Sequence, residues 1–225
     1  MALPLRAVVL DFDGVILESN GLKTQAFERV FARVPEHAAA MVEHHHRNVS
    51  ASRYDKFRHL VVERLGRSAD DPLIADLANA FSEEMMRLIV DCPMVPGAAE
   101  FLSTVSTRVP IFLASMTPQS ELEDILVRRD LASMFSGVYG CPPWPKADAI
   151  RQILGKVGGP EGVVFVGDSA GDQRAACETG TEFIARDSGL AFDVPPPALC
   201  HDMHAVLAAV ARRLPAPQTT VVRPQ

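Results

Sequence analysis

The stretch VVLDFDGVILES, residues 8–19, decides how this chain can fold. It opens with a run of valine and leucine and then places Asp11 and Asp13 one residue apart, directly before Gly14. Continuous apolar runs are typical of strands in a parallel sheet that is covered on both faces. Side chains two residues apart on an extended chain share a face. The stretch therefore predicts a buried strand over residues 6–11 that directs two carboxylates into one cavity.

Further apolar runs alternate with helical patterns along the rest of the chain. The predicted strands cover 110–114, 162–166 and 181–185, with a weaker one at 137–139, and the predicted helices cover 97–107, 118–128, 146–156 and 170–178. Strands that alternate with helices indicate an α/β fold, here a doubly wound, Rossmann-like parallel sheet of about five strands. A last helix over 203–214 and a disordered tail over 215–225 complete the expected order.

One interval interrupts this alternation. Residues 20–92 show helical periodicity and no strand signal, and the stretch CPMVPG at 92–97 has the prolines and glycine of a linker. We therefore expect a helical cap domain over 18–92, inserted into an α/β core domain made of 1–17 and 93–225.

Composition narrows the class of protein. With 225 residues and 48% hydrophobic content the chain can bury a large core, and no apolar run approaches the ~20 residues of a membrane-spanning helix. The net charge of −6 and the lack of a long basic run argue against nucleic acid as a partner. The N-terminus shows no cleavable-signal pattern, so we expect a cytoplasmic protein, as a monomer or homodimer.

Polar residues close three of the predicted strands. Ser115 ends PIFLAS and Asp168 ends GVVFVGD, as Asp11 and Asp13 end the first strand. Ligands of doubly wound sheets bind beyond the carboxyl ends of the strands. A turn or helix-capping role explains any one of these residues, but it does not explain the whole set.

These residues form a recognisable series. The sequence DFDGV, then Ser115, then Lys146, then GDSAGD at 167–172 resembles the four-motif signature of the haloacid dehalogenase-like superfamily in its phosphatase branch. One DxD is a weak signal, whereas four motifs in order over most of the chain are specific. The resemblance implies that Asp11 attacks phosphorus and forms an aspartyl phosphate, and that Asp13 is the general acid and base.

The resemblance also implies a metal site and a phosphate site. Mg²⁺, which oxygen ligands favour, would be held by Asp11, the Asp13 main-chain carbonyl and Asp168. Asp172 would be a further ligand, a residue that orients the ligands, or simply a carboxylate that stabilises a helix N-terminus. Ser115 and Lys146 would bind the phosphoryl oxygens.

Two departures from related enzymes guide the choice of reaction. Enzymes that resemble β-phosphoglucomutase carry a glutamate at the place of Gly167 and a histidine at the place of Lys23. We therefore expect hydrolysis of a small phosphomonoester, such as a sugar phosphate or a phosphoglycolate-like compound. A sugar phosphomutase is the alternative, and a catalytically silent binding module on the same fold is the alternative from another class.

The expected cap carries a basic stretch, HHHRNVSASRYDKF at 44–57. We expect Arg53 and Lys56, with Lys23, to face an anionic or hydroxyl-rich leaving group, although charged residues of this kind are more often a solvated helix face. His44 to His46 are expected to be an exposed helix end and not a metal site.

Overall fold

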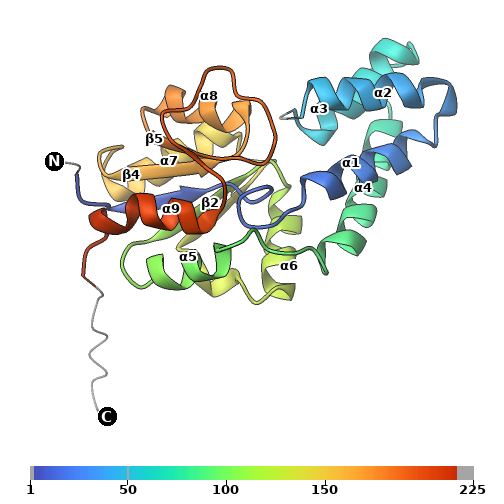
Figure 1. Cartoon of the computed structure of the whole chain (residues 1–225). Helices are drawn as coiled ribbons and strands as arrows, with labels where there is room; N and C mark the ends of the chain where they lie inside the picture. The colour runs from blue at the N-terminus through green and yellow to red at the C-terminus, as the bar shows by residue number, and fades with distance from the viewer. Residues whose placement is uncertain (1–2, 50, 217–225) are drawn as a thin grey trace.

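The computed structural model describes residues 3–49 and 51–216. Its sheet is parallel and six-stranded, in the order β3-β2-β1-β4-β5-β6 (Figure 1). Most of the tail expected to be disordered, from residue 217 onward, lies outside the described residues. The strands are β1 (Ala7–Leu10), β2 (Ile111–Ser115), β3 (Gly137–Gly140), β4 (Val163–Gly167), β5 (Glu182–Arg186) and β6 (Leu199–Cys200).

The first strand of the chain lies in the middle of the sheet. Val8 is in register with Ile111 of β2 on one side and with Val164 of β4 on the other. All four residues of β1 are buried, which agrees with the apolar run that predicted it. Alternate residues face opposite layers, with Val8 and Leu10 in one hydrophobic cluster and Ala7 and Val9 in another.

Helices cover both faces of the sheet, so the predicted doubly wound α/β fold is confirmed. On one face pack α5 (Ala98–Val105), α6 (Gln119–Arg128) and α9 (Met203–Val210), and on the other α7 (Lys146–Val157) and α8 (Ala170–Thr179) (Figure 1). Strand β6 was not predicted, because two residues are too few to show a periodicity. The last α-helix ends at Val210, earlier than expected, and a 3₁₀ turn (Ala211–Arg213) follows; another 3₁₀ turn is Ala132–Met134.

A group of helices stands beside the sheet at the end where β1 finishes (Figure 1). Their shared core contains a cluster of phenylalanines, with the rings of Phe27 and Phe81 4.2 Å apart between centroids. No described helix is long and apolar enough to cross a bilayer. The group consists of α1 (Asn20–Phe31), α2 (Pro35–Arg47), α3 (Arg53–Arg58), a π-helix (His59–Arg64) and α4 (Leu73–Ile89).

Two chain segments connect these helices to the sheet, and they lie side by side. Leu17 forms an antiparallel bridge with Met94. The N–H of Val95 donates to the carbonyl of Ile16 at 2.9 Å, and that of Glu18 donates to Pro93 at 3.0 Å. The helical segment 18–92 therefore leaves and rejoins the core at one place, which is what a hinged cap requires, and the division into core and cap domains stays our prediction.

Candidate active site

The sheet topology brings the predicted acidic residues to one edge. Asp11 and Asp13 follow β1, Asp168 follows β4, and these two strands are neighbours. The strand order reverses at this pair, which is where ligands bind in doubly wound sheets. Gly14 permits the close approach of the two loops, since its φ is +73° and a Cβ there would lie 1.9 Å from Asp168 Oδ2.

Lys146 lies against the predicted nucleophile. Its Nζ is 3.0 Å from Oδ1 of Asp11 and 2.5 Å from Oδ1 of Asp172. Burial alone would lower the pKa of Lys146, but the two carboxylates outweigh it and raise the pKa well above its usual value. The lysine is therefore a permanent ammonium beside Asp11, which is where a transferring phosphoryl group needs a positive charge.

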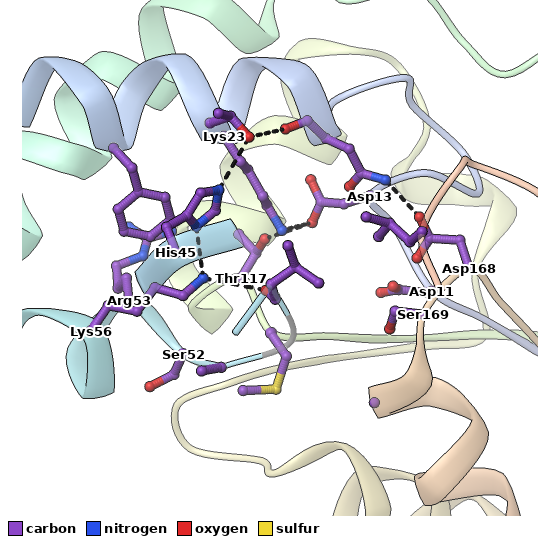
Figure 2. A pocket seen from close by; sticks show the side chains of 18 of the residues that line it. Asp11, Asp13, Lys23, His45, Ser52, Arg53, Lys56, Thr117, Asp168 and Ser169 are labelled. Atoms are coloured by element: carbon purple, nitrogen blue, oxygen red, sulfur yellow. Dashed lines mark hydrogen bonds and ion pairs between the residues drawn. The ribbon is translucent and has the colours of Figure 1, made fainter. Parts of the chain in front are cut away.

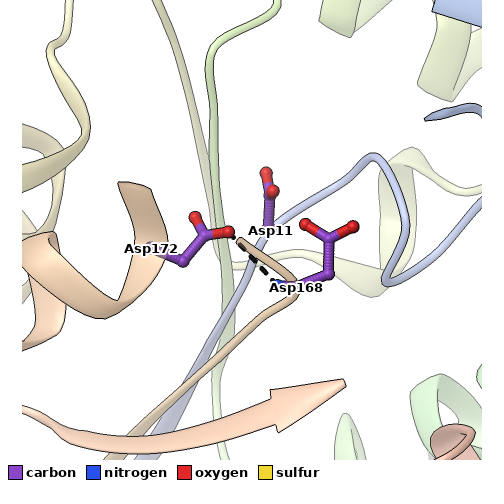
Figure 3. Close-up of side chains that lie close together, drawn as sticks. All are labelled: Asp11, Asp168 and Asp172. Atoms are coloured by element: carbon purple, nitrogen blue, oxygen red, sulfur yellow. Dashed lines mark hydrogen bonds between the residues drawn. The ribbon is translucent and has the colours of Figure 1, made fainter. Parts of the chain in front are cut away.

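Three buried carboxylates lie close together beside Lys146 (Figure 3). Asp11, Asp168 and Asp172 each offer an oxygen, and these oxygens lie within 4.8 Å of one another. Burial, followed by repulsion from Asp172, raises the pKa of Asp11 well above its usual value despite the opposing effect of Lys146. The same two causes, burial and Asp172, raise the pKa of Asp168 to about 6. One ammonium thus leaves the cluster under-neutralised, and its oxygen-only donor set fits Mg²⁺.

The two carboxylate oxygens of Asp172 make different contacts. Its Oδ2 accepts hydrogen bonds from Ser169 Oγ at 2.6 Å and from the N–H of Asp168 at 3.2 Å, and it forms a capping box with Ser169 at the start of α8. Its Oδ1 faces Lys146. The helix-stabilising role is therefore present, and the same side chain also lies beside Asp11, the predicted nucleophile, so the helix role and a role at the metal site do not exclude each other.

Gly167 explains why the carboxylate stands at position 172. A Cβ at Gly167 would lie 2.3 Å from the Cβ and 2.6 Å from the Cγ of Asp172, far inside van der Waals contact. Asp172 is fully buried, and its Cβ is bonded directly to the backbone of α8. A side chain at 167 and the present Asp172 therefore exclude each other, and the glycine in the GDS sequence is a requirement of the aspartate that follows it.

Asp13 is held as a carboxylate. It accepts hydrogen bonds from Ser19 Oγ at 2.6 Å, from Lys23 Nζ at 2.5 Å and from Thr117 Oγ1 at 3.3 Å. Burial would raise the pKa of Asp13, but the charge of Lys23 and the hydrogen bonds from Lys23 and Ser19 lower it overall. Lys23 comes from α1, so a residue of the helical segment sets the protonation of an acid at the sheet edge.

Ser115 lies behind the surface of the site. It closes β2, is 1% exposed, and its Oγ accepts the N–H of Thr117 at 3.1 Å. The cavity wall at this point is formed by Met116 and Thr117. A contact between Ser115 and a phosphoryl group stays a prediction, and Thr117 is the hydroxyl that faces the cavity here.

A cavity of about 340 Å³ separates the acidic cluster from the helical segment (Figure 2). This volume suits a small metabolite. The sheet edge and the helices supply opposite walls of this cavity. The lining residues include Asp11, Asp13, Lys146 and Asp168 from the sheet edge, and Lys23, Phe27, His45, Arg53, Lys56 and Phe81 from the helices.

Arg53 is buried and is already paired. Its Nη1 donates to Glu121 Oε1 at 2.8 Å and to Ser82 Oγ at 2.7 Å, and its guanidinium lies 4.5 Å from the centroid of the Phe81 ring. Glu121 belongs to α6, which packs on the sheet. Arg53 thus forms an ion pair with Glu121 that joins α3 to the core, and it is not a solvated surface charge.

Lys56 is also buried, and its neighbour His45 corrects one expectation. Lys56 is 1% exposed, and its Nζ lies 3.0 Å from His45 Nδ1. The exposed helix end expected for His44 to His46 is wrong for His45, which is 4% exposed. The reason is helical geometry, because His45 is one turn after the buried Met41 on the face of α2 that packs against α1.

Several residues of the site had no predicted role. Asn20 Nδ2 donates to Asp168 Oδ2 at 2.6 Å, and Ser19 and Thr117 bind Asp13. A weak signal existed for the first two, since the polar ESN at 18–20 follows an apolar run directly. Glu121 had none, because its role depends on a contact with a residue 68 positions away.

Comparisons with known proteins agree with this fold and site. The haloacid dehalogenase-like hydrolase family model matches residues 8–186. A haloacid dehalogenase-like hydrolase from Streptococcus pneumoniae has a TM-score of 0.71 at 22% identity, covering 91% of this chain and 98% of that one. A predicted phosphoglycolate phosphatase from Haemophilus somnus has 0.72 at 15%, covering 92% and 98%. CbbY from Rhodobacter sphaeroides, in complex with phosphate, has 0.69 at 19%, covering 90% and 96%.

No curated protein matches the chain. The doubly wound sheet with acids at its switch point defines an enzyme of the α/β class whose site is built on aspartates. The family match covers most of the chain and includes Asp11, Lys146 and Asp168. The chain belongs to the haloacid dehalogenase-like hydrolase family, which confirms the resemblance drawn from its motifs.

Proposed function

We propose that this protein is a Mg²⁺-dependent phosphatase that hydrolyses a small phosphomonoester through an aspartyl phosphate. The observation that carries the proposal is the setting of Asp11, which lies 3.0 Å from Lys146 and within 4.8 Å of carboxylate oxygens of Asp168 and Asp172. A carboxylate needs no base to act as a nucleophile, provided that nearby positive charge keeps it ionised and admits a phosphate.

The reaction takes place in two displacements. An oxygen of Asp11 attacks phosphorus, the ester P–O bond breaks, and the departing alkoxide takes a proton from Asp13. Water then attacks phosphorus, Asp13 takes a proton from that water, and the bond to Asp11 breaks to release inorganic phosphate. The acid and base are thereby returned to their starting forms.

The contacts of Asp13 suit the second displacement. Lys23 opposes the effect of burial and lowers the pKa of Asp13, so Asp13 is ionised while α1 lies against the site, which is the form that takes a proton from water. Donation of a proton in the first displacement needs this ion pair to loosen. Because Lys23 belongs to α1, a movement of the helical segment that takes Lys23 away while Asp13 stays buried would raise the pKa of Asp13 and favour its acid form.

We assign Mg²⁺ to Asp11, the main-chain carbonyl of Asp13, Asp168 and Asp172. When bound, the ion supplies the positive charge that allows a phosphate dianion to approach a carboxylate. Lys146 binds and orients a phosphoryl oxygen as a second positive charge, Thr117 presents its hydroxyl to the cavity with Ser115 behind it, and Asn20 holds Asp168 in position.

The partner is a small phosphorylated metabolite, which agrees with the cavity volume of about 340 Å³. The structural neighbours named above include a predicted phosphoglycolate phosphatase and a protein in complex with phosphate. The substrate is held between the sheet edge and the helices, so the residues of the helices select it.

The sugar phosphomutase alternative is disfavoured by Gly167 and Lys23. Enzymes resembling β-phosphoglucomutase carry a carboxylate at the first of these positions, and Asp172 leaves no room for one. Release of inorganic phosphate should therefore exceed the conversion of a sugar 1-phosphate to its 6-phosphate in the presence of a bisphosphate activator. Faster isomerisation than phosphate release would favour the mutase.

The test is a phosphatase assay with Mg²⁺, using p-nitrophenyl phosphate and a panel of small phosphomonoesters. Asp11→Asn keeps the shape of the nucleophile and removes its charge, so turnover should fall to background. The control is Asp148→Asn, an exposed aspartate on α7. Turnover retained by Asp11→Asn would refute the aspartyl phosphate, and a folded wild-type protein inactive on every substrate would support the silent binding module.

A further inference from the structure

The charges around the cavity are unevenly paired. Five lysine and arginine side chains line it, and four of them have a carboxylate partner. The fifth, Lys56, has no carboxylate within ion-pair distance among the described residues, although it is 1% exposed. The paired four are Lys23 with Asp13, Arg53 with Glu121, Lys146 with Asp11 and Asp172, and Arg174 with Asp193.

The neighbours of Lys56 satisfy it as a donor but do not neutralise it. Its Nζ lies 3.0 Å from His45 Nδ1, 3.3 Å from the carbonyl of Val49 and 4.6 Å from the centroid of the Phe27 ring. An ammonium has three N–H groups, and protein atoms accept two of them. The remaining donor belongs to a side chain that lines the cavity.

His45 is fixed in a form that supports this arrangement. Burial, followed by the charge of Lys56, lowers the pKa of His45 to about 3, so its ring is neutral. Because Nδ1 accepts from Lys56, Nε2 carries the hydrogen and donates to Thr24 Oγ1 at 3.1 Å. The imidazole therefore positions Lys56 without adding a charge of its own.

A buried ammonium without a counter-ion is unfavourable. Burial first and Lys23 second lower the pKa of Lys56 to about 7, despite the opposing effect of Asp55. A neutral hydroxyl from a ligand would leave this unfavourable charge in place, whereas an anion would neutralise it. Among the described residues, the helical wall of the cavity presents no carboxylate that would compete with an anion brought by the substrate.

Resting on the proposed phosphatase function, we propose that Lys56 is the specificity-determining residue for a substrate that carries a second anionic group, a carboxylate or a second phosphate, distal to the phosphate that is cleaved. Figure 2 shows Lys56 on the helical wall, across the cavity from Asp11 and Asp168. Arg53 lies on the same wall but is already neutralised by Glu121. Of these two cations, only Lys56 is therefore available to pair with an anionic group of the substrate.

The experiment compares matched pairs of substrates that differ in this one group. The carboxylate pair is 3-phosphoglycerate against glycerol 1-phosphate, and the phosphate pair is 1,3-propanediol bisphosphate against 3-hydroxypropyl phosphate. The wild-type enzyme should prefer the acidic member of at least one pair by about 10- to 100-fold in kcat/KM, which is what one charge-assisted hydrogen bond contributes. The pair with the larger ratio identifies the distal group.

The variant Lys56→Met removes the charge and keeps a long apolar chain. It should bring the acidic-to-neutral ratio close to one, and Lys56→Arg should restore much of the ratio. The control is Arg58→Met, which removes an exposed cation of the same helix outside this cavity and should leave the ratio as in wild type. Because the readout is a ratio within one protein, a general loss of activity does not imitate it.

Failure of the inference differs from failure of the proposed function. A wild type that hydrolyses p-nitrophenyl phosphate but treats both members of each pair alike would refute the anion site alone. A preference that Lys56→Met leaves intact would refute the assignment to Lys56. A wild type that hydrolyses no phosphomonoester would refute the phosphatase function, and the anion site with it.

Discussion

Replacing Gly167 by alanine adds one methyl group at a crowded point of the site. The new Cβ would lie 2.3 Å from the Cβ of Asp172 and 2.6 Å from its Cγ. Neither neighbour is the end of a flexible side chain, so β4 or α8 must shift. We expect Gly167→Ala to destabilise the fold and to reduce phosphatase turnover, because the shift displaces a carboxylate that contacts Lys146.

The magnitude follows from three contributions. Extra volume in a close-packed interior costs about 1–3 kcal/mol. Loss of the capping box that Asp172 forms with Ser169 removes about 1 kcal/mol, and the ion pair with Lys146 weakens at the same time. Because these effects share one displacement they do not add fully, and we expect a loss of about 2–4 kcal/mol in the free energy of unfolding, or about 5–15 °C in Tm.

The assay is urea unfolding followed by circular dichroism, with Gly155→Ala as the matched control. Gly155 is exposed within α7, and a Cβ there would meet nothing within 4 Å, so the same substitution should stabilise by about 0.5–1 kcal/mol. In an Asp172→Gly background the cost of Gly167→Ala should shrink. The reasoning is refuted if Gly167→Ala is tolerated as well as Gly155→Ala, or if its cost is unchanged when Asp172 is absent.

Three further predictions concern charge. Mg²⁺ added to metal-free protein at pH 7 should raise Tm in calorimetry, because it relieves repulsion within the acidic cluster, and Asp168→Asn should lose most of the shift; equal shifts would contradict the assigned ligands. Lys56→Met should stabilise the protein at pH 7 by roughly 2–4 kcal/mol in urea unfolding. Lys56 holds its proton up to about pH 10.5 in the unfolded chain but only up to about pH 7 in the folded protein. The stability of the wild type should therefore recover as the pH rises from about 7 to about 10.5, and the advantage of Lys56→Met should shrink; an advantage independent of pH would refute this cause. Arg53→Met should lower the free energy of unfolding by about 2–4 kcal/mol, because Glu121 loses its partner, and Glu121→Gln should cost less; two equally mild variants would show that the pair contributes little.

The sequence was sufficient for the sheet and for the acids at its edge. A fully buried strand such as β1 has an uninterrupted apolar run, and the parallel sheet then dictates that Asp11 and Asp168 meet, whatever the details of packing. The fold class and the family could be predicted for this reason. The short strand β6 could not, because its two residues carry no period.

The environments of the charged residues on the helical wall of the cavity could not be predicted from local sequence patterns. Arg53 and Lys56 look alike in the sequence, as basic residues of one polar stretch. Their environments in the structure differ, since Arg53 forms an ion pair with Glu121 of α6 whereas Lys56 donates a hydrogen bond to His45. Both distinctions depend on contacts between different helices, 68 residues apart for Arg53 and 11 for Lys56, and neither hydropathy nor spacing encodes such contacts.

The central place of β1 has a consequence for biosynthesis. Val8 of β1 is in register with Ile111 of β2 and with Val164 of β4, so β1 leaves the ribosome well before either of the strands that flank it. Until β2 and β4 are synthesised, this apolar strand has no partner on either edge, which makes the nascent chain prone to aggregation. The helices of residues 20–89, which contact one another locally, can form during this delay and shield part of the growing chain.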